Sequence, residues 1–230
     1  MSQPIVRADV RAFLEYLNGL DGPRSHQVSL EQARGMMHAS RHAFDAEVGE
    51  LAVIRDIAGG PAELGREATG LVLAGDSAGG NFTIVAALAL RDEAAAVPVI
   101  AQWPIYPAAN PTEGYPSFTD FGEGYLLTRE GMNWFDSCYA PDDGDWRYDP
   151  LHRDQRGLPP TLVVTASLDP LRDQGRAYAA ACAQAGVSVT YLEAEGTIHG
   201  FMNLRKSLPS AQTDLERCIA HLKLMLDGTR

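Results

Sequence analysis

The sequence predicts an α/β protein in which a parallel sheet is flanked by helices on both faces. From residue 70 onward, short apolar runs alternate with helical segments along the chain. The runs lack a polar face, which is typical of strands buried on both sides, and such alternation favours a parallel sheet. The expected strands are 71–74, 97–103 (ending at Pro104), 161–167 and 188–194, and the expected helices between and after them are 78–91, 173–185 and 210–227.

Two amphipathic helices are expected ahead of the sheet. The first ends at Gly19, and its apolar stripe recurs at spacings of three and four residues. The second begins with a capping box at Ser29 and Gln32. We expect its apolar side to pack in the core rather than to contact a ligand. If the helices form a lid, the same side chains would do both. The two stripes are Val6, Val10, Phe13, Leu14 and Leu17, and Ala33, Met36, Met37 and Phe44.

A long segment separates the second expected strand from the third. Residues 106–160 are rich in glycine, proline and aromatic residues, with one further expected helix at 129–139. So long an excursion between two strands of one sheet indicates an inserted lid or a binding loop.

Length and composition limit the class of function. A chain of 230 residues fits one domain, and 45% hydrophobic and 21% charged residues are values of globular proteins. The net charge of -11, with only two lysines (Lys206 and Lys223), argues against a nucleic-acid or anionic-membrane partner. The apolar run 82–90 is far shorter than the roughly 20 residues of a membrane span. Because the N-terminus also lacks a signal pattern, we expect a soluble, cytoplasmic protein.

The cysteines indicate neither a disulfide framework nor a zinc site. Cys138, Cys182 and Cys218 are widely spaced, and no CxxC pair occurs. We expect all three to be buried as small hydrophobic residues.

The stretch Gly75-Asp76-Ser77-Ala78-Gly79 predicts a catalytic serine. It matches G-x-S-x-G between an expected strand and an expected helix, which is the context that a nucleophile elbow requires. The glycines are needed because neighbouring Cβ atoms would obstruct the strained turn that carries Ser77. The amide of Ala78, at the start of the helix, is the expected oxyanion donor.

An acid and a histidine follow Ser77 in the order that a Ser-His-Asp triad of this kind requires. Asp169 stands just after the strand at 161–167, and His199 follows the strand at 188–194. His199 would take the serine proton, and Asp169 would orient the imidazole. Asp173 is the rival acid, but its position at the start of a helix is explained more simply as a favourable charge there.

The remaining histidines have simpler explanations than catalysis. His38 and His42 are four residues apart on a helix, yet no carboxylate nearby completes a metal site, so we expect a solvated face. His152 lies in the loop-rich segment, and His26 and His221 have no motif around them.

Three blocks of the sequence resemble the bacterial hormone-sensitive-lipase-like esterases, an α/β-hydrolase family. They are GDSAGGN at 75–81, SLDPLRDQG at 167–175 and IHGF at 198–201. The run VRADVRAFLEYLNGL at 6–20 and the stretch to RDI at 55–57 are similar to that family's lid helices. The resemblance therefore covers most of the chain.

The resemblance implies hydrolysis of short to medium acyl esters. Ser77, Asp169 and His199 would form the triad, with no metal and no organic cofactor. The stretch FGEGYLLT at 121–128 is similar to the second lid portion and implies an acyl or alcohol pocket near Tyr125 and Leu126. Pairing of the last strand and last helices in the family implies a homo-oligomer, preferably a dimer.

The sequence departs from the family before the nucleophile. No HGGG block, which would supply oxyanion glycines, and no DYRLAPE-like stretch occur, and only the 19 residues 56–74 separate Arg55 from Gly75. Gly59-Gly60 is a poor substitute because Pro61 cannot donate. We therefore expect an internal deletion, with lid helices at 1–57, a truncated core at 58–230 and a second lid segment at about 108–150.

Such a deletion would leave the sheet incomplete in its N-terminal half. The strand at 71–74 would become an edge, and each lost oxyanion donor costs on the order of 10²–10³ in rate. An impaired carboxylic ester hydrolase is the expected function. The alternative is a catalytically silent hydrolase-like module that binds small apolar ligands or a protein, and a peptidase of the same fold ranks last.

Overall fold

A computed structural model describes residues 4–46, 68–142 and 144–228 of the chain. The side chains of residues 41 and 42 are also outside the description. The expected junction between Arg55 and Gly75, with Gly59 and Gly60, falls largely outside the described residues. The expectation of a deletion therefore stays a prediction.

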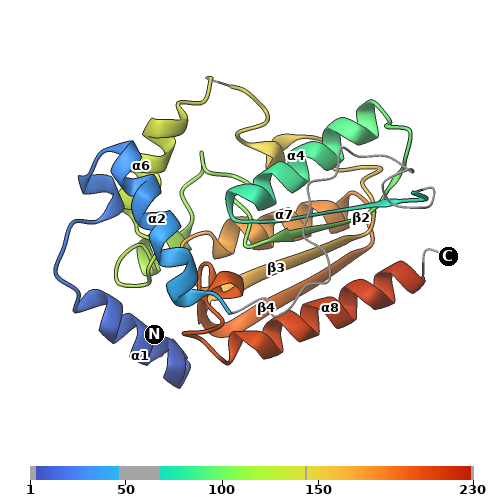
Figure 1. The fold of residues 1–230 in the computed structure, drawn as a ribbon. Coiled ribbons are helices and arrows are strands. Elements are labelled where there is room, and N and C mark those ends of the chain that lie inside the picture. Colours follow the sequence, from blue (N-terminus) through green and yellow to red (C-terminus); the bar gives the residue numbers. More distant parts are fainter. Residues whose placement is uncertain (1–3, 47–67, 143, 229–230) are drawn as a thin grey trace.

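The described residues form a four-stranded parallel sheet with helices on both faces (Figure 1), which confirms the predicted fold class. The strands lie side by side in chain order. Because helical crossovers between them keep the strands parallel, all their carboxyl ends meet at one end of the sheet. The strands are β1 (Leu71–Asp76), β2 (Val99–Ile105), β3 (Thr161–Leu168) and β4 (Val189–Ile198).

Pro104 lies inside β2, so the prediction that this strand ends there is wrong. Pro104 pairs with Gly75 across the β1–β2 ladder. On the other side of β2, the amides of Gln102 and Tyr106 donate to carbonyls of the third-strand region, at 3.0 and 2.6 Å. Position 104 faces that same side because alternate residues do so, and the proline therefore costs a single ladder bond.

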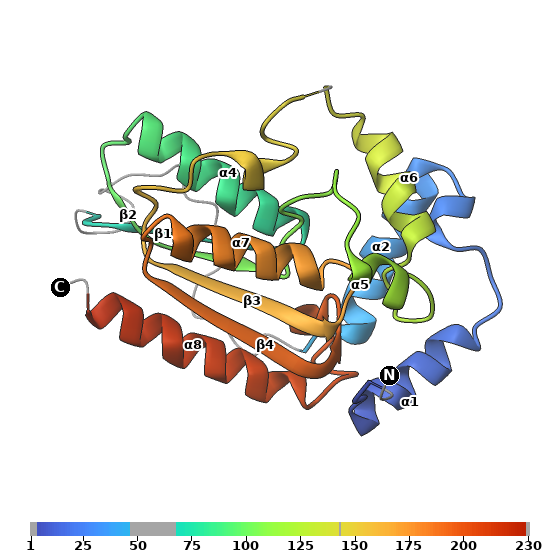
Figure 2. The same ribbon diagram turned by 180° about the vertical axis from the view of Figure 1, so that it is seen from behind.

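Helices cover both faces of the sheet (Figures 1 and 2). The helices α4 (Ala78–Asp92) and α7 (Arg172–Gln184) pack on one face, around Ile84, Leu88 and Tyr178. The helix α8 (Ala211–Asp227) packs on the other face, and α1 (Ala8–Asn18) lies beside the carboxyl end of β4. The interior strand β3 is thereby buried from both sides, whereas no residue of β1 is fully buried.

The first amphipathic helix forms as predicted and is anchored to α8. Val10, Phe13 and Leu14 are buried, and α1 ends at Gly19. Arg7, just before α1, pairs with Asp214 in the first turn of α8. These contacts explain why the N-terminal helix packs on the core.

The second helix, α2 (Leu30–Phe44), begins with the predicted capping box. Ser29 and Gln32 exchange hydrogen bonds of 3.1 and 3.2 Å. However, Met36 and Met37 are 42% and 60% exposed, so the prediction that they pack in the core is wrong. The helix is held at Ala33, which is buried, and at Phe44, which packs on the core, while the methionines between them face outward.

The described part of the segment between β2 and β3 contains two α-helices, α5 (Pro116–Asp120) and α6 (Arg129–Tyr139), and the short 3-10 helix η2 (Pro150–His152). The helix α6 has the predicted bounds, and the Thr128 side chain caps it by accepting from the amide of Gly131 at 3.0 Å. It contacts the short helix η1 (Ser25–Gln27), where His26 lies 3.1 Å from Glu130. The two expected lid portions therefore touch one another.

Within the described residues, β1 is one edge of the sheet and β4 is the other. Leu71 and Val72 at the start of β1 are each 37% exposed. This agrees with the expected edge position, although residues 47–67 are not described. No helix among the described residues has the length and apolar character that crossing a membrane would take.

Two of the three cysteines are buried as predicted, and one is not. Cys182 on α7 and Cys218 on α8 are buried, and burial raises their pKa values to about 11 and about 12. Cys138 is exposed because α6, on which it lies, has no buried residue.

We expect one thiol per chain to react with an aromatic disulfide reagent in the native protein at pH 8. Cys138 is accessible, whereas burial keeps Cys182 and Cys218 protonated and covered. Absorbance of the released thiolate should give one equivalent before and three after unfolding in guanidinium. Cys138→Ser should remove the native signal, and rapid reaction of a second thiol in that variant would contradict this packing.

Candidate active site

Ser77 occupies the turn between β1 and α4. Its backbone angles are φ 55 and ψ -117, a sparsely populated conformation that must be imposed by its surroundings. The amide of Ser77 donates to the carbonyl of Ile105 at 2.9 Å, and its carbonyl accepts from Ala108 at 3.3 Å and from Asn81 at 3.2 Å. The nucleophile candidate is therefore fixed by the end of β2 as well as by its own strand and helix.

Two glycines make this turn possible, but only one of them was predicted. A Cβ on Gly75 would lie 2.3 Å from the carbonyl oxygen of Gly79. A Cβ on Gly80 would lie 2.8 Å from the Cβ of Pro107. A Cβ on Gly79 would meet nothing within 4 Å. The steric argument therefore holds at Gly75 and moves from Gly79 to Gly80, where the helix passes against the end of β2.

The structure brings Ser77, His199 and Asp169 together in one line of hydrogen bonds. His199 Nε2 lies 2.9 Å from Ser77 Oγ, and His199 Nδ1 lies 2.7 Å from Asp169 Oδ2. Asp169 is fully buried, and its other oxygen accepts from the amide of Leu171 at 2.8 Å. The arrangement can relay a proton from the serine while the imidazole keeps a fixed orientation.

Asp173, the rival acid, is engaged elsewhere. It accepts from the amide of Ser117 at 3.0 Å and pairs with Arg172 at 2.8 Å and with Arg176 at 3.1 Å. Burial opposes its ionisation, but the hydrogen bond and charge of Arg172 lower the pKa of Asp173 below its ordinary value. It lies in the first turn of α7, as the sequence indicated.

Two residues that the sequence analysis did not single out lie beside the histidine. The ring of Tyr106, fully buried, is centred 4.8 Å from the imidazole of His199, and its hydroxyl donates to Asp76 at 3.3 Å. Asn203 donates to the same carboxylate oxygen at 2.9 Å. Burial, together with the charge of Asp76, raises the pKa of Tyr106 well above its ordinary value, so the phenol keeps its proton and can donate. Neither residue belongs to a recognisable motif.

The amide of Ala78 lies at the N-terminus of α4, as expected. The amides of a helix's first turn have no partner earlier in the helix, which leaves them available to an anion. Gly59 and Gly60, the weak candidates for further donors, lie outside the described residues.

The expectation that His38 and His42 form a solvated face stays a prediction, because the side chain of His42 lies outside the described residues. No group of three histidine, cysteine or acidic residues that could hold a metal is found in the described part of the chain. His152 lies 3.5 Å from Asp149 and 3.7 Å from Glu113 at the surface, and His26 pairs with Glu130.

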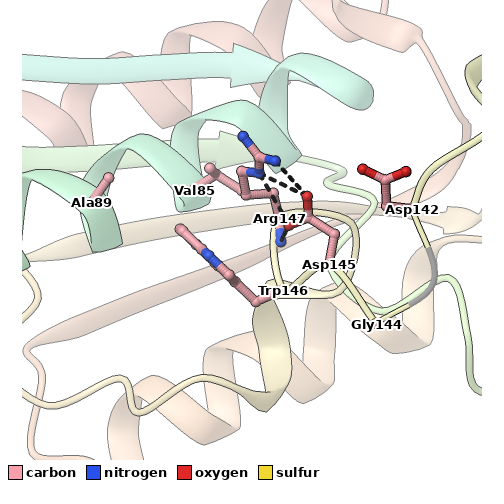
Figure 3. Close-up of a pocket in the computed structure, with 7 residues that line it drawn as sticks. All are labelled: Val85, Ala89, Asp142, Gly144, Asp145, Trp146 and Arg147. Carbon is pink, nitrogen blue, oxygen red and sulfur yellow. Dashed lines mark hydrogen bonds and ion pairs between the residues drawn. The ribbon is translucent and has the colours of Figure 1, made fainter.

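The expected pocket near Tyr125 and Leu126 stays a prediction. Tyr125 packs edge-on against Phe121, with ring centroids 5.3 Å apart, and Leu126 is 37% exposed with φ 74. Two hollows of the described surface lie along α4, and Figure 3 shows one of them. One of about 640 Å³ and an adjoining one of about 390 Å³ share four lining residues, which are Val85, Asp142, Asp145 and Arg147.

Gly75→Ala should destabilise the protein by about 2 kcal/mol or more, because its Cβ would overlap backbone atoms that cannot move independently of the elbow. Urea denaturation followed by circular dichroism measures the change. Gly79→Ala is the matched control and should be neutral or stabilising by up to about 1 kcal/mol, since its Cβ meets open space in a helix. Equal effects of the two variants would refute the described turn.

Comparison with known proteins agrees with this architecture. A family model described as α/β hydrolase fold matches residues 26–203. The carboxylesterase NlhH of Mycobacterium tuberculosis is 32% identical over 97% of this chain and 76% of its own length. The ethyl acetate hydrolase of Pseudomonas putida is 35% identical over 70% of this chain and 52% of its own.

Solved structures show the same fold. An ester hydrolase from the metagenome of Lake Arreo superposes with a TM-score of 0.84 at 25% identity, covering 96% of this chain and 98% of that one. A thermostable esterase from Pseudomonas putida superposes with a TM-score of 0.86 at 22% identity, covering 98% and 99%. The chain therefore belongs to the α/β-hydrolase fold family, among the hormone-sensitive-lipase-like esterases.

Proposed function

We propose that the protein hydrolyses carboxylic esters of short to medium acyl chains through an acyl-enzyme on Ser77. The observation that carries the proposal is the hydrogen-bonded line from Ser77 through His199 to the buried Asp169, at 2.9 and 2.7 Å. Membership of an esterase family and similarity to named carboxylesterases support the same reaction class.

In the proposed reaction, His199 Nε2 accepts the Ser77 proton as Oγ attacks the ester carbonyl carbon. The tetrahedral intermediate collapses, and the C–O bond to the alcohol breaks as His199 returns the proton to the leaving oxygen. Water, deprotonated by His199, then releases the acid and restores Ser77. Asp169 holds the imidazole in the required tautomer and stabilises its protonated form.

The oxyanion would be bound by the amide of Ala78 at the start of α4. Relatives of the family add glycine amides from an HGGG block, which this sequence lacks. Each missing donor costs on the order of 10²–10³ in rate, so we expect an impaired enzyme. Tyr125 and Leu126 are the proposed substrate contacts, and the lid is proposed to comprise residues 1–57 and about 108–150.

A catalytically silent module that binds an apolar ligand or a protein is the second candidate. The exposed Met36 and Met37 on α2 favour it, because they offer an apolar surface outside the core. A homodimer through β4 and α8 is likewise proposed, and the exposed Ile219 and Leu224 on α8 support it.

Ser77→Ala tests the proposed function directly. The parent protein should be labelled covalently by a fluorophosphonate probe and should hydrolyse nitrophenyl acetate and butyrate slowly, whereas the variant should do neither. Mass spectrometry of the labelled peptide locates the adduct. An unlabelled parent, or ester hydrolysis that is equal in the variant, would favour the silent module instead.

Asp169→Asn should lower the rate of labelling on the order of 10⁴-fold, because the amide favours the wrong imidazole tautomer while preserving shape. Asp173→Asn is the matched control, since that carboxylate bonds to Ser117 and Arg172 rather than to His199. Its labelling rate should stay within about twofold of the parent once the fraction folded is corrected for. Loss of labelling in the Asp173 variant alone would reverse the assignment of the acid.

A further inference from the structure

The residue directly after each of the four strands either belongs to the candidate site or packs beside it. Ser77 follows β1, Asp169 follows β3 and His199 follows β4. The corresponding residue after β2 is Tyr106, which has φ 34 and is fully buried. A tyrosine with a positive φ is uncommon, and such strain is retained where the surroundings over-determine it.

The two hydrogen bonds of His199 do not by themselves fix the tilt of its ring. The bonds to Ser77 and Asp169 act at the two ring nitrogens and therefore define an axis through the imidazole. Rotation about that axis changes the direction of Nε2 little, but it tilts the ring away from the orbital alignment that proton transfer requires. A packing partner beside the ring is needed to restrict the tilt.

Tyr106 supplies that packing partner. Its ring is centred 4.8 Å from that of His199 at an angle of 58°, and 5.4 Å from that of Phe201 at 67°. The tyrosine is itself anchored at both ends. Its amide donates to the carbonyl of Val164 at 2.6 Å, and its hydroxyl donates to Asp76 at 3.3 Å.

Asp76 connects this packing to the nucleophile. It precedes Ser77 in the chain, and the same carboxylate oxygen accepts from Tyr106 and from Asn203, at 3.3 and 2.9 Å. Asn203 lies in the short helix η3 (Phe201–Asn203), which continues from the residue after His199. One carboxylate therefore holds both the aromatic ring beside the imidazole and the loop that carries it.

We propose that Asp76, Tyr106 and Asn203 form a clamp that positions His199 relative to Ser77, with Tyr106 as its central positioning residue. The inference rests on the proposed function, because positioning matters only if His199 acts on Ser77. None of the three is assigned a chemical step. They would change the fraction of time for which the imidazole is aligned with Ser77. A change in that fraction alters the catalytic rate constant and leaves the affinity for substrate unchanged.

Tyr106→Phe tests the clamp, because it keeps the ring beside His199 and removes only the hydroxyl, which donates to Asp76 and also lies against the backbone of Met202. We expect the rate of fluorophosphonate labelling to fall about tenfold, since small misplacements of reacting groups cost one to two orders of magnitude. With nitrophenyl butyrate, kcat should fall by the same factor while KM stays unchanged. Asn203→Ala should act in the same direction.

Tyr178→Phe is the matched control. Tyr178 is also fully buried, and its hydroxyl accepts from Gln102 at 3.0 Å within the core beneath α7. Both substitutions remove one buried hydroxyl that has two hydrogen-bonding neighbours, which for Tyr178 are Gln102 and Cys182, so their melting temperatures should fall by similar amounts. The control should retain the labelling rate of the parent.

A proton magnetic resonance signal provides a readout that does not depend on turnover. The proton on His199 Nδ1, which is hydrogen-bonded to Asp169, should resonate far downfield. This signal should broaden or shift in Tyr106→Phe but not in Tyr178→Phe. Equal labelling rates in the two phenylalanine variants, or a loss that appears only in KM, would overturn the clamp and leave the proposed function standing. A parent protein that the probe does not label would remove the proposed function, and the clamp with it.

Discussion

The close approach of β1 to the first turn of α4 is the constraint on which the rest of the site depends. Ser77 has a positive φ, and the Cα of Gly75 passes so near the carbonyl of Gly79 that no side chain fits between them. Backbone strain of this kind persists only where several contacts enforce it. Here the hydrogen bonds of the Ser77 backbone to Ile105 and Ala108 do so, which makes β2 part of the nucleophile's support.

The parallel sheet converts distant positions in the sequence into neighbours. Ser77 and His199 are 122 residues apart, and His199 and Asp169 are 30 apart, yet all three follow strands whose carboxyl ends lie at one edge. Ligands of open α/β sheets are bound at that edge because the loops that leave it are free to vary. Strand order equals chain order, and the triad spans the whole width of the described sheet.

Much of this could be predicted because the informative residues recur in local patterns. The strands, the capping box at Ser29 and the positions of Asp169 and His199 follow from periodicity and from order along the chain. Tyr106 and Asn203 could not be found in this way, because their roles arise from contacts with Asp76 across the sheet edge. The same holds for Met36 and Met37, whose exposure depends on where α2 is anchored, and for Gly80, whose neighbour Pro107 belongs to the next strand's loop.

The described residues include three side chains placed for proton transfer but one expected donor for the oxyanion. The three hydrogen-bonded residues Ser77, Asp169 and His199 directly follow β1, β3 and β4. The donor expected for the oxyanion is the single amide of Ala78. Among the described residues, β1 is paired on one side only, with β2. Within the described part of the chain, the strain at Ser77 is carried by β2 and α4. Stability and nucleophile geometry are consequently coupled at β1, since any loosening of its ladder with β2 would relax the turn that holds Ser77 against His199.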